Sequence, residues 1–451
     1  MPYVLFEANN DFSLILNGVA FDGHFEFSDD GREWNEVTKN EYVRVKSKDG
    51  KLFFRGKGNR YFKNIGRYDS VFGLGTKDDK EITVSGNILS LIDYETVEKG
   101  KEPVMGGGAF FGLFSGLPII DASCLILPSL ELSENCYSCM FERCDKLVKP
   151  PKLPATKLAK CCYSGMFYDC ERLEYAPELL ATELADCCYS GMFRGCKSLK
   201  DAPALPATKL AEWCYESMFW DCISLKEAPE LPAKTLATHC YESMFFRCKG
   251  LTSAPKLPAT TLANGCYVNM FNACIGLTIP PKLPAINLKS HCYASMFYGC
   301  KWLVEVPELP ATTLADGCYV NMFASCSSIK LSDVKGKGYS TPFCIASENS
   351  DCAVKGMFAH NGGTYNKNIK VGKTYYLKTD DLSEKEEALC TLLESGYLAR
   401  ESSGILNYYK KKPVKGERYW KGEMSIKCIN DLFPQCEFSF ITWNDNEPWE
   451  I

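Results

Sequence analysis

The chain has little of what most enzymes and membrane proteins carry. It contains only four histidines in 451 residues, and the patterns GxSxG, HExxH, GxGxxG and the phosphate-binding P-loop do not occur. No stretch approaches the roughly 18 apolar residues that a membrane-spanning helix needs. We therefore expect no enzymatic activity, no cofactor and no membrane insertion.

The chain also lacks an excess of positive charge. Its net charge is −5, with 24% charged and 46% hydrophobic residues, which is close to the average of globular proteins. This balance gives no electrostatic reason to expect a nucleic-acid partner. The first 18 residues contain no basic segment, and Asp11 interrupts them before an apolar run develops. The start of the chain does not read as a secretory signal.

What the chain has in abundance is repetition. Residues 109–330 contain eight copies of a 26-residue unit in strict register. The repeated side chains include two Cys positions, one Tyr, one Met and one Phe. The first copies of these positions are Cys136, Tyr137, Met140, Phe141 and Cys144, and the last are Cys318, Tyr319, Met322, Phe323 and Cys326. A fixed period of this length predicts a solenoid, in which each unit buries its apolar face only against its neighbours.

The 25 cysteines need a separate explanation, because 16 of them occupy the two repeated positions. Disulfide frameworks belong to short domains with small cores, so we interpret these thiols as small, buried apolar spacers. Neighbouring rungs of a solenoid lie close enough for some disulfides, which leaves that alternative open. Cys136 and Cys139 form one CxxC pattern without a second pair, so we expect no metal site.

The spacing within one repeat predicts a helix followed by an extended segment. Thr156 is suited to cap a helix that runs to Cys170, and the apolar residues of this stretch cover half of a helical wheel. These residues are Leu158, Ala159, Cys162, Tyr163, Met166, Phe167 and Cys170. The stretch from Leu173 to Leu179 contains Pro177 and is too short for a helix. We therefore predict an α/β solenoid with one short strand and one helical segment per turn.

The order of these motifs resembles a known family. Phe-x-x-Cys-x-x-Leu, a Pro-containing stretch and Leu-x-x-x-Cys-Tyr-x-x-Met-Phe are similar to the BspA-type leucine-rich repeats of bacterial surface proteins and of phages and prophages of gut bacteria. The resemblance implies a right-handed leucine-rich-repeat solenoid that serves adhesion or host recognition without catalytic residues. The absence of an export signal favours the phage-encoded relatives, which implies a phage tail or virion protein assembled in the host cytoplasm. A bacterial cell-surface or secreted protein is the alternative.

The repeats have distinct flanking regions. We predict a β-sandwich-like domain over 1–95, a linker over 96–108, the solenoid over 109–330, and a C-terminal cap with a mixed α+β region over 331–451. Phe111, Phe114 and Leu117 suggest a degenerate first repeat at the Phe, Cys and Leu positions, and Met357 with Phe358 suggests a degenerate last one.

Local patterns predict secondary structure in both flanks. Alternation of apolar and polar residues predicts strands over 24–28, 42–46 and 51–55, and Asp-Gly pairs at 30–31 and 49–50 predict turns. In the C-terminal region, Ser383 and Glu386 predict the start of a helix through Leu393. Tyr and Trp alternate with Lys and Arg over 408–420, which is typical of a solvated basic loop or of a contact to a polyanion or sugar.

The candidate binding residues are positions that vary inside the fixed repeat. The residue after each repeated Phe, and the residue seven positions before it, fall on the outward side of the helical wheel. Together they predict an aromatic stripe with a few basic side chains. The candidates are Tyr168, Arg194, Trp213, Trp220, His239, Phe246, His291 and Tyr298. A contiguous exposed aromatic stripe often marks an interaction surface, but such rings can also serve as packing cover.

Two classes of function without catalysis follow from this pattern. The first is recognition of a cell-surface protein or glycan by the repeats, with the terminal domains contacting other virion or surface proteins. The second is a structural spacer whose terminal domains make all the contacts. An enzyme with unrecognised carboxylates is the third reading, and the lack of catalytic motifs argues against it.

Overall fold

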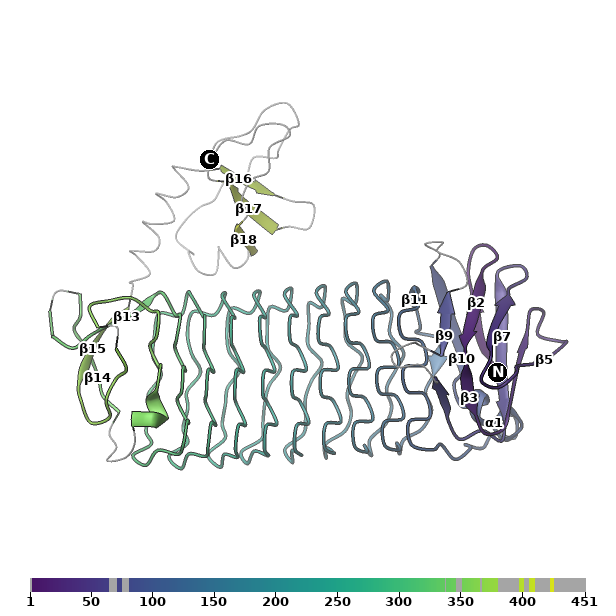
Figure 1. Cartoon of the computed structure of the whole chain (residues 1–451), viewed down its shortest axis with the longest axis horizontal. Helices are drawn as coiled ribbons and strands as arrows, with labels where there is room; N and C mark the ends of the chain where they lie inside the picture. The colour runs from purple at the N-terminus through teal and green to yellow at the C-terminus, as the bar shows by residue number, and fades with distance from the viewer. Residues whose placement is uncertain are drawn as a thin grey trace.

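The structure is a computed structural model. It describes residues 2–64, 71–74, 81–336, 338–345, 351–365 and 367–379, together with the backbone of three short strands between 397 and 425. A β-rich N-terminal unit is followed by a long row of stacked coils, which ends in a small sheet (Figure 1). None of the described helices is long and apolar enough to cross a membrane.

The N-terminal unit is built from antiparallel strands in two main sheets. Within this unit the larger sheet has the strand order β10-β1-β7-β4-β5, and the smaller has the order β6-β2-β9. The strands up to residue 87 are β1 (Val4–Glu7), β2 (Ser13–Asn17), β3 (Val19–Phe21), β4 (His24–Ser28), β5 (Asn35–Glu36), β6 (Tyr42–Lys46), β7 (Lys51–Lys57), β8 (Phe62–Asn64), β9 (Phe72–Leu74) and β10 (Ile82–Asn87). Strands β3 and β8 form a separate pair.

The predicted strands of this unit are confirmed. Residues 24–28 form β4, residues 42–46 form β6, and residues 51–55 begin β7. Asp49 and Gly50 both have positive φ, at 50° and 70°, as a tight turn before β7 requires. Between the two sheets, the ring of Phe72 in β9 packs on Phe6 in β1 and Phe54 in β7, at centroid distances of 5.1 and 4.9 Å.

The first coil is joined to the N-terminal unit by a shared sheet. Strands β11 (Ile119–Asp121) and β12 (Leu125–Ile126) belong to the coils, yet both pair in parallel with β10. Phe114 packs against Phe6 and Phe72, at 5.6 and 6.0 Å between ring centroids. Helix α1 (Ser90–Glu98) packs on β7, so the segment predicted as a linker from residue 96 begins inside this helix. The core therefore runs without interruption from the N-terminal unit into the coils.

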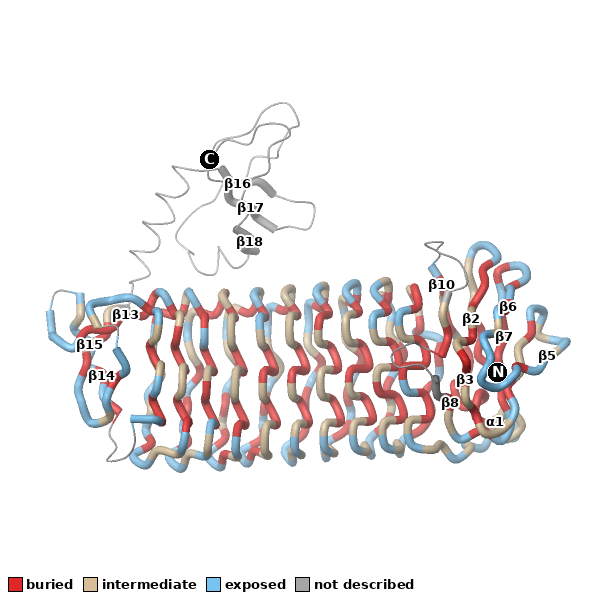
Figure 2. The backbone as a smooth tube through the Cα atoms, viewed as in Figure 1, coloured by how far each residue is buried: buried red, intermediate tan, exposed pale blue. Residues whose placement is uncertain are grey.

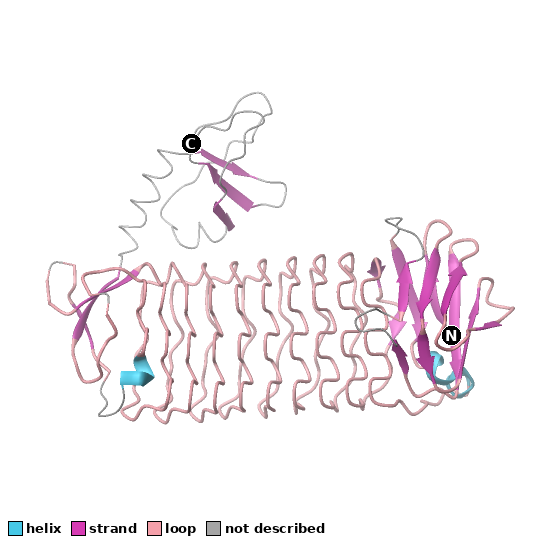
Figure 3. Cartoon of the chain, viewed as in Figure 1, coloured by secondary structure: helices cyan, strands magenta, loops and turns pink. Residues whose placement is uncertain are grey.

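Each coil bonds to the next through alternate backbone amides. The N–H of Tyr163 donates to the carbonyl of Cys188 in the next coil at 3.0 Å. Phe167 donates in the same way to Met192 at 2.9 Å, whereas the intervening Met166 donates back to Tyr163 in its own coil at 3.2 Å. This alternation repeats from coil to coil, so the stack is held by hydrogen bonds along its axis as well as by its core. Figure 3 shows the stacked coils drawn almost entirely as loops and turns.

The helix predicted in each repeat is wrong. Between residues 109 and 330, all of which the structure describes, the segments that carry the repeated Cys, Tyr, Met and Phe form consecutive turns. The physical reason is a positive φ at every fourth residue, as at Cys161 (53°), Gly165 (61°) and Asp169 (56°), which an α-helix does not accept. The buried residues occur as adjacent pairs that recur every four positions, such as Cys162 with Tyr163 and Met166 with Phe167. This spacing resembles the 3.6-residue period of a helix.

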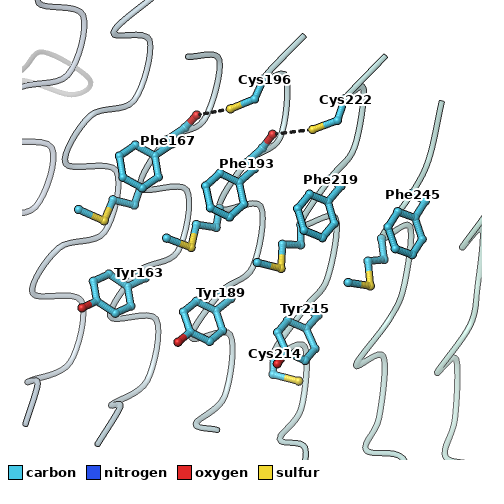
Figure 4. Packing of buried hydrophobic residues seen from close by; sticks show 14 of the residues in the cluster. Tyr163, Phe167, Tyr189, Phe193, Cys196, Cys214, Tyr215, Phe219, Cys222 and Phe245 are labelled. Carbon is cyan, nitrogen blue, oxygen red and sulfur yellow. Dashed lines mark hydrogen bonds between the residues drawn. The ribbon is translucent and has the colours of Figure 1, made fainter. Parts of the chain in front are cut away.

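The interior of the stack consists of ladders of identical side chains (Figure 4). Buried segments recur at the same place in each coil (Figure 2). Phe193 stacks on Phe219 with ring centroids 5.8 Å apart, and Tyr189 stacks on Tyr215 at 5.9 Å. The repeated thiols are buried, as predicted, and every described cysteine is free. In one Cys ladder each Sγ donates to a Phe carbonyl of the preceding coil, as from Cys196 to Phe167 at 3.1 Å. The thiols thus serve as small buried groups with a weak hydrogen bond.

Extended structure in the coils is brief. The outer corners are joined by single-residue parallel bridges, as between Tyr175 and Asp201 and between Glu183 and Lys209. Cross-coil ion pairs accompany them, including Lys209 with Glu183 at 2.7 Å and Lys200 with Glu174 at 2.6 Å. The Pro-containing stretches therefore contribute isolated bridges rather than continuous strands.

Degenerate coils close both ends of the stack. At the first end, Phe110 stacks on Tyr137, and Phe114 packs against Phe141 with the ring planes tilted by 45°, so these two residues replace the repeated Tyr and Phe. The assignment of Phe111 to the Phe position is wrong, because Phe111 is 53% exposed. The assignments of Phe114 to the Cys position and Leu117 to the Leu position are wrong too, because Phe114 packs on the repeated Phe141 and Leu117 follows Phe114 by three residues, as Cys144 follows Phe141.

At the second end, Phe358 stacks on Phe323 at 5.5 Å between ring centroids. Met357 is buried beside it, so the prediction of a degenerate last repeat is confirmed.

A short sheet follows the last coil. It has the order β13-β15-β14, and a 3₁₀ helix forms the start of the final degenerate coil, where Tyr319 donates to Ala353. The bounds are β13 (Ile329–Ser332), β14 (Thr341–Phe343), η1 (Asp351–Val354) and β15 (Tyr375–Thr379). Strands β16 (Tyr397–Arg400), β17 (Ile405–Tyr409) and β18 (Gly422–Ser425) form an antiparallel sheet. The helix predicted from residue 383 and most of the basic segment 408–420 lie outside the described residues.

Candidate functional site

The predicted candidate residues form two ladders on the outside of the coils. We call the positions directly after the core Phe ladder A. Its members are Glu142, Tyr168, Arg194, Trp220, Phe246, Asn272, Tyr298 and Ala324. Ladder B lies seven residues earlier in each coil. Its members are Asn135, Cys161, Cys187, Trp213, His239, Gly265, His291 and Gly317.

Ladder A brings four of the candidates into direct contact. Trp220 stacks on Phe246 with ring centroids 4.1 Å apart. On its other side, the guanidinium of Arg194 lies 4.2 Å from the Trp220 ring and 5.5 Å from that of Tyr168. These four side chains are all half-buried. Both faces of the Trp220 indole are therefore occupied, and its edge remains for contact with another molecule.

Ladder B contains a second stack beside the first. The rings of Trp213 and His239 are nearly parallel, with centroids 4.0 Å apart and planes 9° apart. The imidazole of His239 then lies over the backbone of the next coil at Gly265, where an added Cβ would sit 2.3 Å from its Cε1 atom. His239 is thus held between an indole and a glycine, and only glycine leaves room for the ring.

Ladder B places large side chains on strained backbone. Trp213 has a φ of 58°, and His239 and His291 both have a φ of 53°. L-residues with bulky side chains rarely adopt this left-handed region. Gly265 and Gly317 occupy the same ladder positions in other coils without this strain.

The predicted stripe is not continuous. Gly265 and Asn272 occupy the coil after Phe246, and they separate His291 and Tyr298 from the other candidates. Tyr298 is 37% exposed. His291 lies over Gly317, where an added Cβ would sit 2.5 Å from its Nε2 atom. The structure therefore brings four candidates together in ladder A and two in ladder B, and it leaves His291 and Tyr298 apart from both stacks.

The ring contacts also run in a different direction from the one predicted. The sequence suggested pairs within one coil, such as Trp213 with Trp220. In the structure the stacked partners come from adjacent coils, as in Trp213 with His239 and Trp220 with Phe246. The direction follows from the coil stacking, because equivalent residues of hydrogen-bonded neighbours lie closer than residues seven apart in one coil.

Two carboxylates that the sequence patterns did not predict lie between ladder B and ladder A in the chain. Glu216 and Glu242 occupy equivalent positions of adjacent coils, three residues after Trp213 and His239. Glu216 accepts hydrogen bonds from the hydroxyls of Ser190 at 2.5 Å and Ser217 at 2.6 Å. Their 26-residue spacing on an outward position was the available signal.

The second carboxylate is coupled to the histidine of ladder B. Glu242 Oε2 lies 2.6 Å from His239 Nδ1, and both side chains are less than a third exposed. Burial raises the pKa of Glu242, and the nearby charge of Glu216 raises it further, while His239 acts in the opposite direction. Glu216 and Glu242 thus form a row of carboxylates, partly withdrawn from water, between the positions of the two ladders.

Chemically, this surface can form hydrogen bonds and ring-edge contacts. Glu216 and Glu242 offer acceptors to hydroxyl or ammonium groups, and the guanidinium of Arg194 offers donors. Within the described ranges, no three His, Cys, Asp or Glu side chains lie close enough together to hold a metal ion. No family model, curated protein or solved structure matches the chain.

Proposed function

We propose that this chain is a non-catalytic recognition protein that binds a cell-surface protein or glycan through ladders A and B. Its central contact surface is the group of Arg194, Trp213, Trp220, His239 and Phe246, together with the carboxylates Glu216 and Glu242. Following the resemblance to phage-encoded BspA-type repeats, the setting is a phage tail or virion, with a bacterial cell surface as the alternative. The terminal regions then attach the coils to other proteins of the assembly.

The observation that carries this proposal is the placement of two bulky rings, Trp213 and His239, at left-handed backbone positions of ladder B. Placing an L-residue in the left-handed region costs about 1–2 kcal/mol relative to the right-handed one. Gly265 and Gly317 avoid that cost at the same positions, whereas Trp213 and His239 do not. The coil imposes this conformation on ladder B, since Asn135, Cys161 and Cys187 have a positive φ as well. What sets Trp213 and His239 apart is that a bulky ring occupies a position where glycine costs less, which favours a role beyond packing.

The distribution of side chains adds support. Ladder A carries Glu142 at one end and Ala324 at the other, so the repeat itself does not require a ring there. The large side chains gather on consecutive coils, beside carboxylates that are partly withdrawn from water. Tyr, Trp and Arg dominate many recognition surfaces, and their clustering here fits that role.

A second candidate function is a structural spacer. The observation in its favour is that the ring faces of ladder A cover one another, with Trp220 between Arg194 and Phe246. Rings arranged in this way stabilise neighbouring coils even when they bind nothing. In that case the N- and C-terminal regions make all the contacts.

A binding survey with the full chain distinguishes the two functions. The labelled protein is applied to an array of bacterial surface glycans and to intact bacterial cells. The recognition protein gives saturable binding that is lost when Trp213 and Trp220 are both replaced by Ser. The spacer gives no binding, or binding that the double variant retains in full.

A further inference from the structure

The thiols that reach the surface of the coils differ from those in the core. Cys161 and Cys187 occupy ladder B on adjacent coils, and both are partly exposed. Cys139 is also partly exposed, but its counterpart in the next coil is Gly165. On the coils between residues 135 and 326, all of which the structure describes, Cys161 and Cys187 are the one pair of equivalent thiols that both reach solvent.

The backbone holds these two residues in the same conformation at neighbouring positions. Both have a φ of 53°, so their side chains leave the backbone in the same direction. The N–H of Cys161 donates to the carbonyl of Asp186, next to Cys187, at 2.9 Å. Hydrogen-bonded neighbours lie about 4.8 Å apart, within the roughly 4.4–6.8 Å that a disulfide spans between Cα atoms. Burial raises the pKa of Cys187 to about 11, and the neighbouring Cys161 side chain raises it too, as expected of two adjacent thiols.

The core thiols lack the conditions for the same reaction. Cys162 and Cys188 also lie on adjacent coils, but both are fully buried. In the other core ladder the Sγ of Cys196 is directed to the carbonyl of Phe167 rather than to a neighbouring sulfur. Exchange requires that a thiolate reach the oxidant, so burial protects these groups.

We propose that Cys161 and Cys187 form a reversible disulfide between adjacent coils by exchange with a low-molecular-weight disulfide such as oxidised glutathione. One cysteine, as its thiolate, attacks a sulfur of the small disulfide and releases one small thiol. The thiolate of the other cysteine then attacks the protein sulfur of this mixed disulfide and releases the second small thiol. The two protein thiols lose two protons and two electrons, and the small disulfide is reduced to two thiols.

The disulfide lies next to the proposed contact surface but is independent of it. Cys187 directly precedes Trp213 along ladder B, so the bridge fixes the coil that adjoins the Trp213 ring. The proposal requires only the adjacency of the two thiols, and it stands or falls separately from ligand recognition.

The test uses the native full chain incubated with oxidised glutathione. The remaining thiols are then alkylated in denaturant, and the chain is digested with trypsin. Cleavage after Lys160, Arg172 and Arg194 places Cys161 and Cys187 in separate peptides. We expect a loss of two of the 25 thiols and a disulfide-linked pair of peptides 161–172 and 173–194.

Single variants assign the bridge among the neighbouring cysteines. Cys161→Ser and Cys187→Ser should each abolish the linked pair, whereas the matched control Cys139→Ser should retain it. Thermal unfolding checks that the three variants remain folded. An unchanged thiol count, glutathione attached to both cysteines without a bridge, or a linked pair that persists in Cys187→Ser would each overturn the proposal.

Discussion

The imidazole of His239 lies flat against the indole of Trp213, with 4.0 Å between ring centroids and 9° between planes. The opposite face of the imidazole covers Gly265. Three adjacent coils therefore meet in one stack of ring, ring and bare backbone. Position 265 must therefore be glycine if His239, a candidate binding residue in the preceding coil, is to stay stacked on Trp213.

Replacing Gly265 with Ala tests this stack. Gly265 has a φ of 59°, and an added Cβ would overlap the His239 ring. We expect a loss of about 1–2 kcal/mol in the free energy of unfolding from the left-handed backbone alone. A further loss of roughly 1 kcal/mol should follow as His239 leaves Trp213. Chemical denaturation measures both.

Gly191→Ala is the matched control for this substitution. Gly191 has nearly the same φ, at 58°, but an added Cβ would have no atom within 4 Å. The free energy of unfolding that Gly191→Ala loses should therefore come from the left-handed backbone alone. Equal losses for the two variants would show that His239 is not held against Gly265.

The contact between Trp220 and Phe246 should be measurable as a coupling energy. Stacked aromatic pairs contribute about 0.5–1.5 kcal/mol beyond their burial. A double-mutant cycle with Trp220→Ala and Phe246→Ala is expected to give a coupling in this range. Trp220 with Tyr298, three coils away, serves as the control and should give a coupling near zero. A coupling energy of zero for Trp220 and Phe246 would show that their contact does not stabilise the coils. The observation that favours the structural spacer would then be lost.

Thiol reactivity should separate the core ladders from the surface cysteines. Burial raises the pKa of Cys136, Cys162, Cys214 and Cys266 to about 12. At pH 8 these thiols are almost entirely protonated and shielded, so alkylation of the native chain should spare them. Denaturation should expose all 25 thiols. Rapid alkylation of the core thiols in the native chain would contradict the packing described.

The carboxyl of Glu242 should make stability depend on pH in a particular direction. Because its folded-state pKa lies above the ordinary value of 4.5, the native chain binds this proton more tightly than the unfolded chain does. The free energy of unfolding should therefore fall as pH rises from about 4.5 through the raised pKa. Glu242→Gln should weaken this fall, as denaturation across this range would show.

Glu183→Gln gives the opposite comparison. The hydrogen bond and charge of Lys209 lower the pKa of Glu183, so its contribution is present above 4.5 and is lost as pH falls through the lowered pKa. The two variants should shift the pH profile in opposite directions. Shifts of the same sign would contradict the local environments assigned to both carboxyls.

The sequence predicted the positions of the repeated core residues but not their backbone. Cys162, Tyr163, Met166, Phe167 and Cys170 are all buried, as the helical wheel implied. Pairs of buried residues that recur every four positions also fall on one side of a helical wheel with a period of 3.6. The wheel therefore could not distinguish a helix from consecutive turns. The distinguishing signal was the frequent Gly, Asn, Asp and Ser at every fourth residue, which favours positive φ.

The candidate site was predicted only in part for a related reason. The outward positions of Trp220 and Trp213 follow from the 26-residue register, which is visible in the sequence. The register does not show which side chains contact one another. Contacts such as that of Arg194 with the Trp220 ring depend on how far each coil is shifted relative to the next. The stacking of His239 over Gly265 could have been suspected from the alternation of His and Gly in ladder B.

The most direct test of recognition compares binding and stability in the same variants. Trp220, Phe246 and Tyr298 are replaced by Ser together, and Tyr175→Ser, which removes an exposed ring outside both ladders, is the control. Binding to the target cells and the melting temperature are measured for each. Our account predicts a loss of binding of roughly tenfold or more in a triple variant that still folds, and no loss in the control. A folded triple variant with unchanged binding would contradict it.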